Sequence, residues 1–118
     1  MVGTISQLKG NPITHPDALN ATMKVLVSQS EGWVDHVMRV IEVEAGGYTP
    51  KHAHVWSHIN YIISGTGLLF LDGVEHPVAA GSYAFVPGNA LHQFRNTGNT
   101  LFQFICIVPK EGHPSSAK

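Results

Sequence analysis

Short β-type runs separated by closely spaced turn signals are the feature that most limits how this 118-residue chain can fold. Runs rich in β-branched and aromatic residues, such as 101–108 (LFQFICIV), end at Gly, Pro, Asn or Asp about every 8–12 residues. Asp72-Gly73 is a dipeptide that favours a two-residue type I′ hairpin turn. No long helical repeat of apolar residues stands out. The pattern predicts an all-β sandwich or barrel of about eight to ten strands.

The expected elements can be given by residue range. Residues 1–20 are irregular because glycines and prolines recur there, although Asp17 favours a short helical turn over 18–23. We expect Ala45-Gly46-Gly47 to break a strand and the chain to become extended again over 48–54. The other strands are expected at 24–28, 36–44, 59–63, 67–71, 74–78, 83–86, 91–95 and 101–108.

Composition narrows the classes of function. Charged residues make up only 13% of the chain, against roughly 25% on average, and the seven Lys and Arg residues form no cluster. We therefore expect no nucleic-acid partner and no binding to a membrane surface. Cys106 is the single cysteine, so no intrachain disulfide forms. No apolar run reaches the roughly 20 residues of a membrane-spanning helix, and we expect a cytoplasmic protein.

The length corresponds to one domain. We expect residues 1–118 to form it, with a barrel core at about 24–109, an N-terminal arm at 1–20 and a flexible tail at 110–118. The low charge content and strands with apolar residues on both faces predict a homodimer whose sheets pack face to face.

Histidines gather in one part of the sequence. The chain has eight, and His52, His54 and His58 lie within seven residues of one another. Neutral imidazole is the commonest protein ligand of transition metals. In a strand, His52 and His54 would project from one face, and His92 would join them from a distant strand. We predict a metal site. The alternative is a barrel in which the same histidines are hydrogen-bonded core residues.

Strand alternation predicts a pocket beside these histidines. His92 and Phe94 share one face, and Phe104 and Cys106 share the inward face of their own strand. A barrel of about eight strands has room inside for one small ligand. We expect Phe94, Phe104 and Cys106 to line the pocket and Trp56 to guard its entrance. The alternatives are ordinary core phenylalanines and an inert buried cysteine.

These residues resemble the cupin superfamily. Its first motif is Gly, five residues, His-x-His, a Glu and a final Gly, and its second is Gly, five residues, Pro, then His and Asn. The resemblance spans residues 46–96. The matching positions here are Gly46, His52, His54, Gly65, Gly81, Pro87, His92 and Asn96.

The chain departs from the motif at one ligand position. Ile59 stands where the glutamate is expected, and His58 precedes it, as in small manganese cupins that use four histidines. The resemblance implies a homodimeric jelly-roll barrel with one divalent transition metal per subunit, held by His52, His54, His58 and His92. Manganese is the metal it favours most, with Fe, Ni, Zn and Cu also possible. Four imidazoles leave the site near a charge of +2 and without a built-in carboxylate base.

The resemblance implies a metal-dependent oxidoreductase of the dioxygenase type, acting on a small apolar or aromatic substrate. A second hypothesis is a non-redox lyase or isomerase in which the ion is a Lewis acid. A third is a non-catalytic module that binds a small ligand or a metal. The fold alone does not separate them, because one fold hosts many chemistries.

Overall fold

The computed structural model describes residues 1–113, and strands make up most of its regular structure. The all-β prediction is confirmed. Three single-turn 3-10 helices are also present: η1 (Ile5–Gln7), η2 (Gln29–Glu31) and η3 (Lys110–Gly112). The strands are β1 (Asn11–Pro12), β2 (Leu19–Val27), β3 (His36–Tyr48), β4 (His58–Ser64), β5 (Thr66–Leu71), β6 (Val74–Ala79), β7 (Tyr83–Val86), β8 (His92–Asn96) and β9 (Phe102–Pro109).

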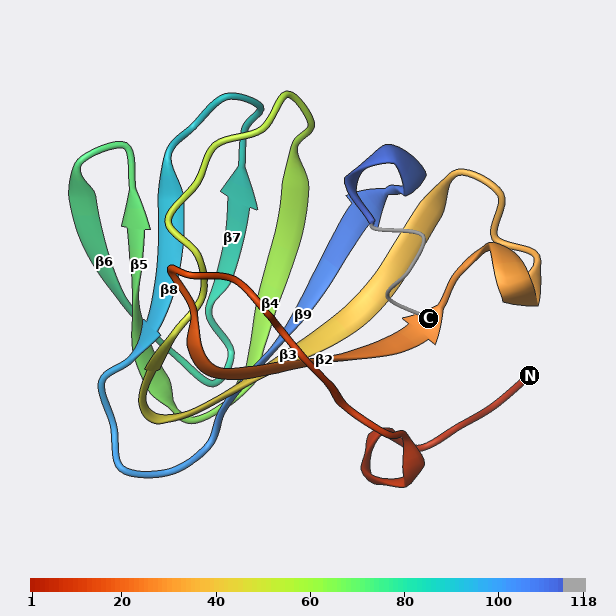
Figure 1. Ribbon diagram of the computed structural model, residues 1–118, viewed down its shortest axis with the longest axis horizontal. Coiled ribbons are helices and arrows are strands. Elements are labelled where there is room, and N and C mark those ends of the chain that lie inside the picture. Colours follow the sequence, from red (N-terminus) through yellow and green to blue (C-terminus); the bar gives the residue numbers. More distant parts are fainter. Residues whose placement is uncertain (114–118) are drawn as a thin grey trace.

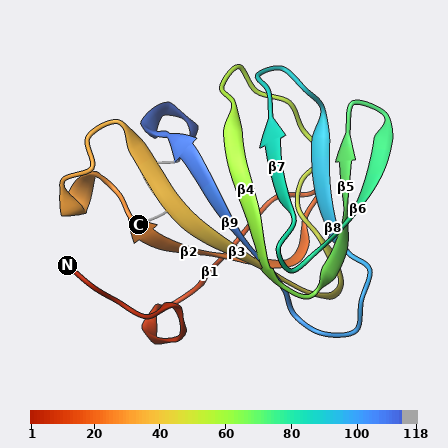
Figure 2. The ribbon, with the colours of Figure 1, turned by 180° about the vertical axis from the view of Figure 1, so that it is seen from behind.

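The strands curl into a nearly closed antiparallel barrel (Figure 1). Their hydrogen-bonded order is β6-β5-β8-β3-β9-β4-β7. In addition, β2 pairs antiparallel with β3. The long strand β3 joins the two halves, because Tyr48 pairs with β8 whereas His36 to Val43 pair with β9. The view from behind shows β2, β3 and β9 diverging from β5, β6 and β8 (Figure 2). The buried core cluster takes side chains from β2, β3, β4, β5, β7, β8 and β9.

Alternation along the strands separates the interior from the surface. In β9, Phe102, Phe104, Cys106 and Val108 are buried, whereas the residues between them are partly exposed. The rings of Phe94 and Phe104 stack with centroids 4.2 Å apart. Both rings belong to the buried core cluster of the barrel.

The hairpin turn at Asp72-Gly73 is confirmed. Both residues have positive φ, 46° and 86°, as a type I′ turn requires. Leu71 and Val74 pair on either side of the turn, so β5 and β6 form the predicted two-stranded ribbon.

Three local predictions are wrong. Residues 18–23 enter β2 instead of forming a helical turn, because Ala21 pairs with Val43 of β3. Gly46 has a φ of 80° but does not end β3, which continues to Tyr48. Residues 49–57 form a loop, so 48–54 is not a strand, and His52 makes only an isolated bridge with His92.

Part of the segment predicted as a flexible tail has regular structure. Residues 110–112 form η3, and His113 is buried. Residues 114–118, the rest of the predicted tail, lie outside the described residues. Across residues 1–113, the structure contains no helix that is long and apolar enough to cross a membrane.

Candidate metal centre

The loop between β3 and β4 brings two histidines to the start of β8. The backbone N–H of His52 donates to the carbonyl of His92 at 3.1 Å, and the reverse hydrogen bond is 3.0 Å. Two residues on, the carbonyl of His54 accepts from the N–H of Asn89 at 2.6 Å. The loop is thus fixed to the barrel at both histidines. This tertiary pairing brings His52 and His54 together in place of the predicted strand.

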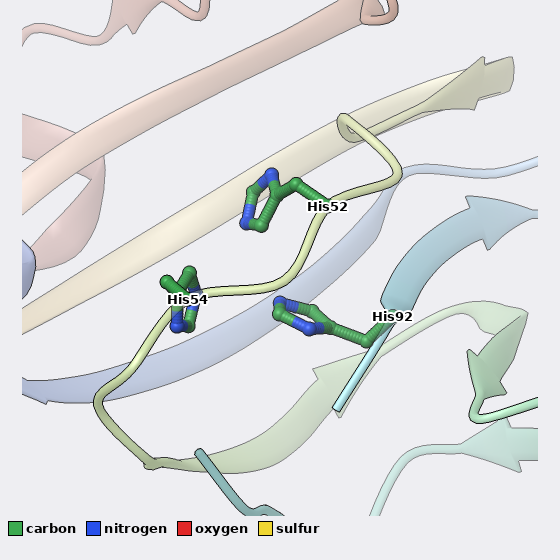
Figure 3. A group of neighbouring side chains, drawn as sticks. All are labelled: His52, His54 and His92. Atoms are coloured by element: carbon green, nitrogen blue, oxygen red, sulfur yellow. The ribbon is translucent and has the colours of Figure 1, made fainter. Parts of the chain in front are cut away.

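His52, His54 and His92 form a close group (Figure 3). Each offers one ring nitrogen, and these three atoms lie within 4.8 Å of one another. The ring centroids are 4.8 to 5.0 Å apart. Three imidazoles at such separations could hold one metal ion.

His58 adjoins this group from the first position of β4. It is 5% exposed, and its Nε2 lies 3.2 Å from Nε2 of His92. Its ring centroid is 5.4 Å from that of His54. The next residue, Ile59, is 53% exposed and faces out of the barrel. At the start of β4, the inward side chain is therefore that of His58.

Backbone carbonyls determine which nitrogen two of the histidines offer. Nδ1 of His54 lies 3.0 Å from the carbonyl of Trp56, and Nδ1 of His92 lies 2.9 Å from that of Ala90. A carbonyl oxygen only accepts, so each Nδ1 carries the proton and donates it. In the neutral ring the other nitrogen, Nε2, then has a free lone pair for a metal.

Asn60 orients His58 in the same way. Its amide Nδ2 donates to the carbonyl of Ile105 at 3.3 Å, which leaves its Oδ1 to accept from Nδ1 of His58 at 2.7 Å. His58 and His92 therefore face each other through two unprotonated Nε2 atoms. Two lone pairs 3.2 Å apart repel unless a cation lies near both. Metal–nitrogen bonds of about 2.1 Å give ligand separations of roughly 3.0 to 3.4 Å, so this pair fits an ion.

Three of the histidines, His52, His58 and His92, are held in their neutral form. Burial, followed by the charge of His92, lowers the pKa of His58 from 6.5 to about 3. Burial, followed by the charges of His92 and His54, lowers the pKa of His52 to about 4. Burial also lowers the pKa of His92. Neutral imidazole is the form that binds metal, so no proton has to leave at neutral pH.

A cavity of about 420 Å³ opens beside the histidines. Phe94, Phe104, Cys106 and Trp56, the four predicted pocket residues, all line it. The Trp56 ring stacks on His54 with centroids 4.5 Å apart and an angle of 14°. The remaining wall is mainly apolar and consists of Ile13, Met23, Ile41, Pro50, Ala53 and Gly112, with His15, Arg39, Thr49 and Asn60 as the polar members beside the cluster.

Arg39 is the residue of this site that the sequence analysis missed. It projects from β3 into the cavity, with Nη2 lying 3.7 Å from Sγ of Cys106. Arg39 shares one face of β3 with Val37 and Ile41, so a charged residue on an otherwise apolar inward face was the available signal. His15 also lies in the cavity wall and was not among the predicted pocket residues.

A small antiparallel barrel with a histidine cluster beside an apolar cavity defines the class of protein. The chain belongs to the cupin family. The family model described as "Cupin domain" matches residues 39–108, which run from β3 to β9. The matched region includes the whole histidine cluster.

Solved and curated proteins are similar to this chain. The polyketide cyclase RemF from Streptomyces resistomycificus superimposes with a TM-score of 0.83 at 26% identity, covering 92% of this chain and 80% of RemF. Auxin-binding protein 1 of Arabidopsis thaliana is 29% identical over 67% of this chain and 47% of its own length. An oxalate-binding protein of Thermotoga maritima is 34% identical over 58% and 57%. The chain thus spans about half the length of these two curated relatives.

Proposed function

We propose that this protein is a metal-dependent enzyme that acts on a small, mainly apolar, ring-bearing organic molecule. The observation that carries the proposal is the pair of unprotonated Nε2 atoms of His58 and His92, 3.2 Å apart beside the cavity. Two facing lone pairs stabilise a cation better than they stabilise any neutral group. The stacked rings of Phe94 and Phe104 supply a flat apolar wall for the substrate.

The proposed ligands are His52, His54, His58 and His92, with one divalent transition metal per chain. All four donors are neutral nitrogen atoms, so the bound ion would keep its charge of about +2. Intrinsic imidazole affinity favours Cu, Ni or Zn, whereas the family resemblance favours Mn or Fe. Bound there, the ion supplies Lewis acidity, or electron transfer if it is redox-active. Protein residues orient the imidazoles, and the apolar walls exclude water.

Oxidation of the substrate by dioxygen or peroxide is the first reaction class. It follows from the family resemblance and agrees with an apolar, aromatic cavity wall that holds an electron-rich ring. The cavity residues include no carboxylate among those described, so this mechanism takes its proton acceptor from the oxidant or the substrate.

A non-redox reaction is the second class, and one observation favours it. One of the solved structures similar to this chain, over 92% of its length, is a polyketide cyclase. A cyclisation needs a polarised carbonyl and a folded substrate, which a Lewis acid and a shaped apolar cavity supply. The name of the oxalate-binding relative supports a third possibility, ligand binding without turnover.

One experiment separates these functions. The metal-free protein is reloaded with Mn, Fe or Zn and assayed against electron-rich aromatic compounds and linear poly-β-ketones, with an oxygen electrode and product analysis. Oxygen uptake with Mn or Fe and none with Zn supports the oxidoreductase. Equal turnover with Zn and no oxygen uptake supports the Lewis-acid enzyme. Binding without turnover under every condition overturns the proposal of an enzyme.

A further inference from the structure

Among the described residues, Arg39 of the cavity wall contacts two sulfur atoms and one imidazole, and none of these groups is an anion. Nη1 donates to Sδ of Met23 at 3.8 Å and lies 3.3 Å from Nδ1 of His113. Nη2 donates to Sγ of Cys106 at 3.7 Å. Sulfur is a weak acceptor, so within the described part of the chain these contacts position the guanidinium without neutralising its charge.

No carboxylate within the described residues pairs with Arg39. The cavity wall contains no Asp or Glu, and the ion pairs found in residues 1–113 involve other groups. Glu42 lies on the same strand but on its opposite face, where Lys24 is 3.4 Å away and Gln103 donates to it at 2.6 Å. Nε of Arg39 is sealed from solvent and has no hydrogen-bond partner in the described structure. Arg39 as a whole is partly exposed, and a charge held partly out of water is stabilised when an anion accompanies it.

We propose that Arg39 binds the carboxylate of the substrate. The substrate class is then a small aromatic carboxylic acid, or an equally apolar one, bound with its apolar body in the cavity. The inference rests on the function proposed above, because it specifies the molecule that the same cavity takes.

Three properties of the cavity select this chemistry. The planar guanidinium matches a carboxylate through two parallel N–H···O hydrogen bonds. Arg39 is the only Lys or Arg in the described wall, so the side chains of the wall offer one guanidinium, which pairs with one carboxylate. Ile41 lies two residues along β3, and Phe94 and Phe104 stack inside the same wall, so an apolar body finds contacts on more than one side.

The test compares two probes of the same shape and different charge. Binding of benzoate and of benzamide is measured by calorimetry on wild type, both loaded with metal and metal-free. Benzoate is expected to bind at least about tenfold more tightly than benzamide in both forms of the protein. Added salt is expected to weaken the binding of benzoate. A preference seen only with metal present would mean that the carboxylate binds the ion, and would overturn the role of Arg39.

Variants make the assignment specific to one residue. Arg39→Gln is expected to remove the preference for benzoate, and Arg39→Lys to retain part of it, because the ammonium keeps the charge and loses the planar fork. Arg95→Gln is the matched control, since Arg95 is an exposed arginine on β8 paired with Glu75. An unchanged benzoate affinity in folded Arg39→Gln would refute the inference. Should that variant not fold, equal wild-type affinities for the two probes would refute it.

The metal content of every sample separates this inference from the proposed function. If wild type binds about one equivalent of metal and shows no preference for the acid, the carboxylate assignment fails and the metal enzyme stands. If no metal binds and the Arg39-dependent preference persists, the metal-dependent function fails and Arg39 remains an anion site.

Discussion

Asn60 controls the orientation of one proposed ligand through two hydrogen bonds, one to the carbonyl of Ile105 and one from His58. Asn60→Leu removes the acceptor for Nδ1–H of His58, so the ring can rotate or change tautomer. We expect metal affinity to fall about 10- to 100-fold. Asn60→Asp keeps an acceptor and is expected to retain most of the affinity. Competition with a chelating dye measures both, and equal losses in the two variants would contradict the proposed role.

The lowered pKa of His58 predicts how the metal-free protein responds to acid. Its folded pKa of about 3 lies below the unfolded value of 6.5, so between these values the unfolded chain binds the extra proton. Stability is therefore complete above about pH 6.5 and is lost as pH falls toward about 3. The slope per group is at most about 1.4 kcal/mol per pH unit. His52 is an exposed residue, so solvent screening reduces its share.

Urea unfolding of the metal-free protein at pH 7, 6 and 5 checks this response. His58→Gln cannot take up the proton and is expected to lose less stability over the same range. Identical pH dependence in wild type and the variant would contradict the assignment of the effect to His58.

Sequence patterns located the histidine cluster but not Arg39. His-x-His and a distant histidine are local, recurrent signals, and the sequence alone led to all four residues. Arg39 gave a weaker signal, because long charged side chains on apolar faces usually reach solvent. Its position also depends on a contact with His113, whose Nδ1 lies 3.3 Å from Nη1 although the two residues are 74 positions apart in the sequence.

At the scale of elements, Gly65 is the position where the barrel depends most on the absence of a side chain. Its φ is 84°, and a Cβ there would overlap the carbonyl oxygen of Leu101. Gly73 has nearly the same φ, 86°, but nothing lies within 4 Å of its Cβ position. Gly73→Ala is expected to cost about 1–2 kcal/mol from backbone strain alone. Gly65→Ala is expected to lower the free energy of unfolding by clearly more than Gly73→Ala does. Urea unfolding of both variants measures the difference.

The two variants control each other, since they share the backbone conformation and differ in the space available. Equal costs for the two would show that the β4–β5 junction relaxes around a side chain, and the close approach to β9 would then not matter for stability.

The hairpin at 72–73 was predictable because its turn needs positive φ at both central residues, and Asp-Gly supplies it locally. The extent of β3 was not predictable by the same logic. Gly46 and Gly47 suggested a break, but Leu19 pairs with Tyr48 and holds the strand past them. Residues 49–54 have an extended pattern, but they bond to β8 only at Thr49 and His52, so no continuous strand pairing forms there. Pairing with distant residues outweighed local propensity in both places.

At the scale of the whole molecule, the outer face of β4 and β7 carries large exposed apolar and aromatic side chains. Ile59 pairs with Phe85, and Tyr61 pairs with Tyr83. Phe85 is 60% exposed and Tyr83 is 83% exposed. We propose that this face forms the homodimer expected from the low charge content, since contiguous exposed apolar surface marks an interface.

The double variant Tyr83→Glu, Phe85→Lys places charges on this face and is expected to sediment as a monomer, while wild type sediments as a dimer at micromolar concentration. Val74→Glu is the control, because Val74 is also exposed but lies on β6. A wild-type monomer, or a dimer that survives the double variant, would rule out this face.

The central claim is that His52, His54, His58 and His92 hold one divalent transition metal. The most direct test is metal analysis by plasma mass spectrometry on wild type, His58→Ala and the control His76→Ala, which removes an exposed histidine of β6. About one equivalent per chain in wild type and the control, with a strong loss in His58→Ala, is the predicted result. Wild type that holds no metal even after reconstitution with Mn, Fe, Ni, Cu and Zn would contradict the claim.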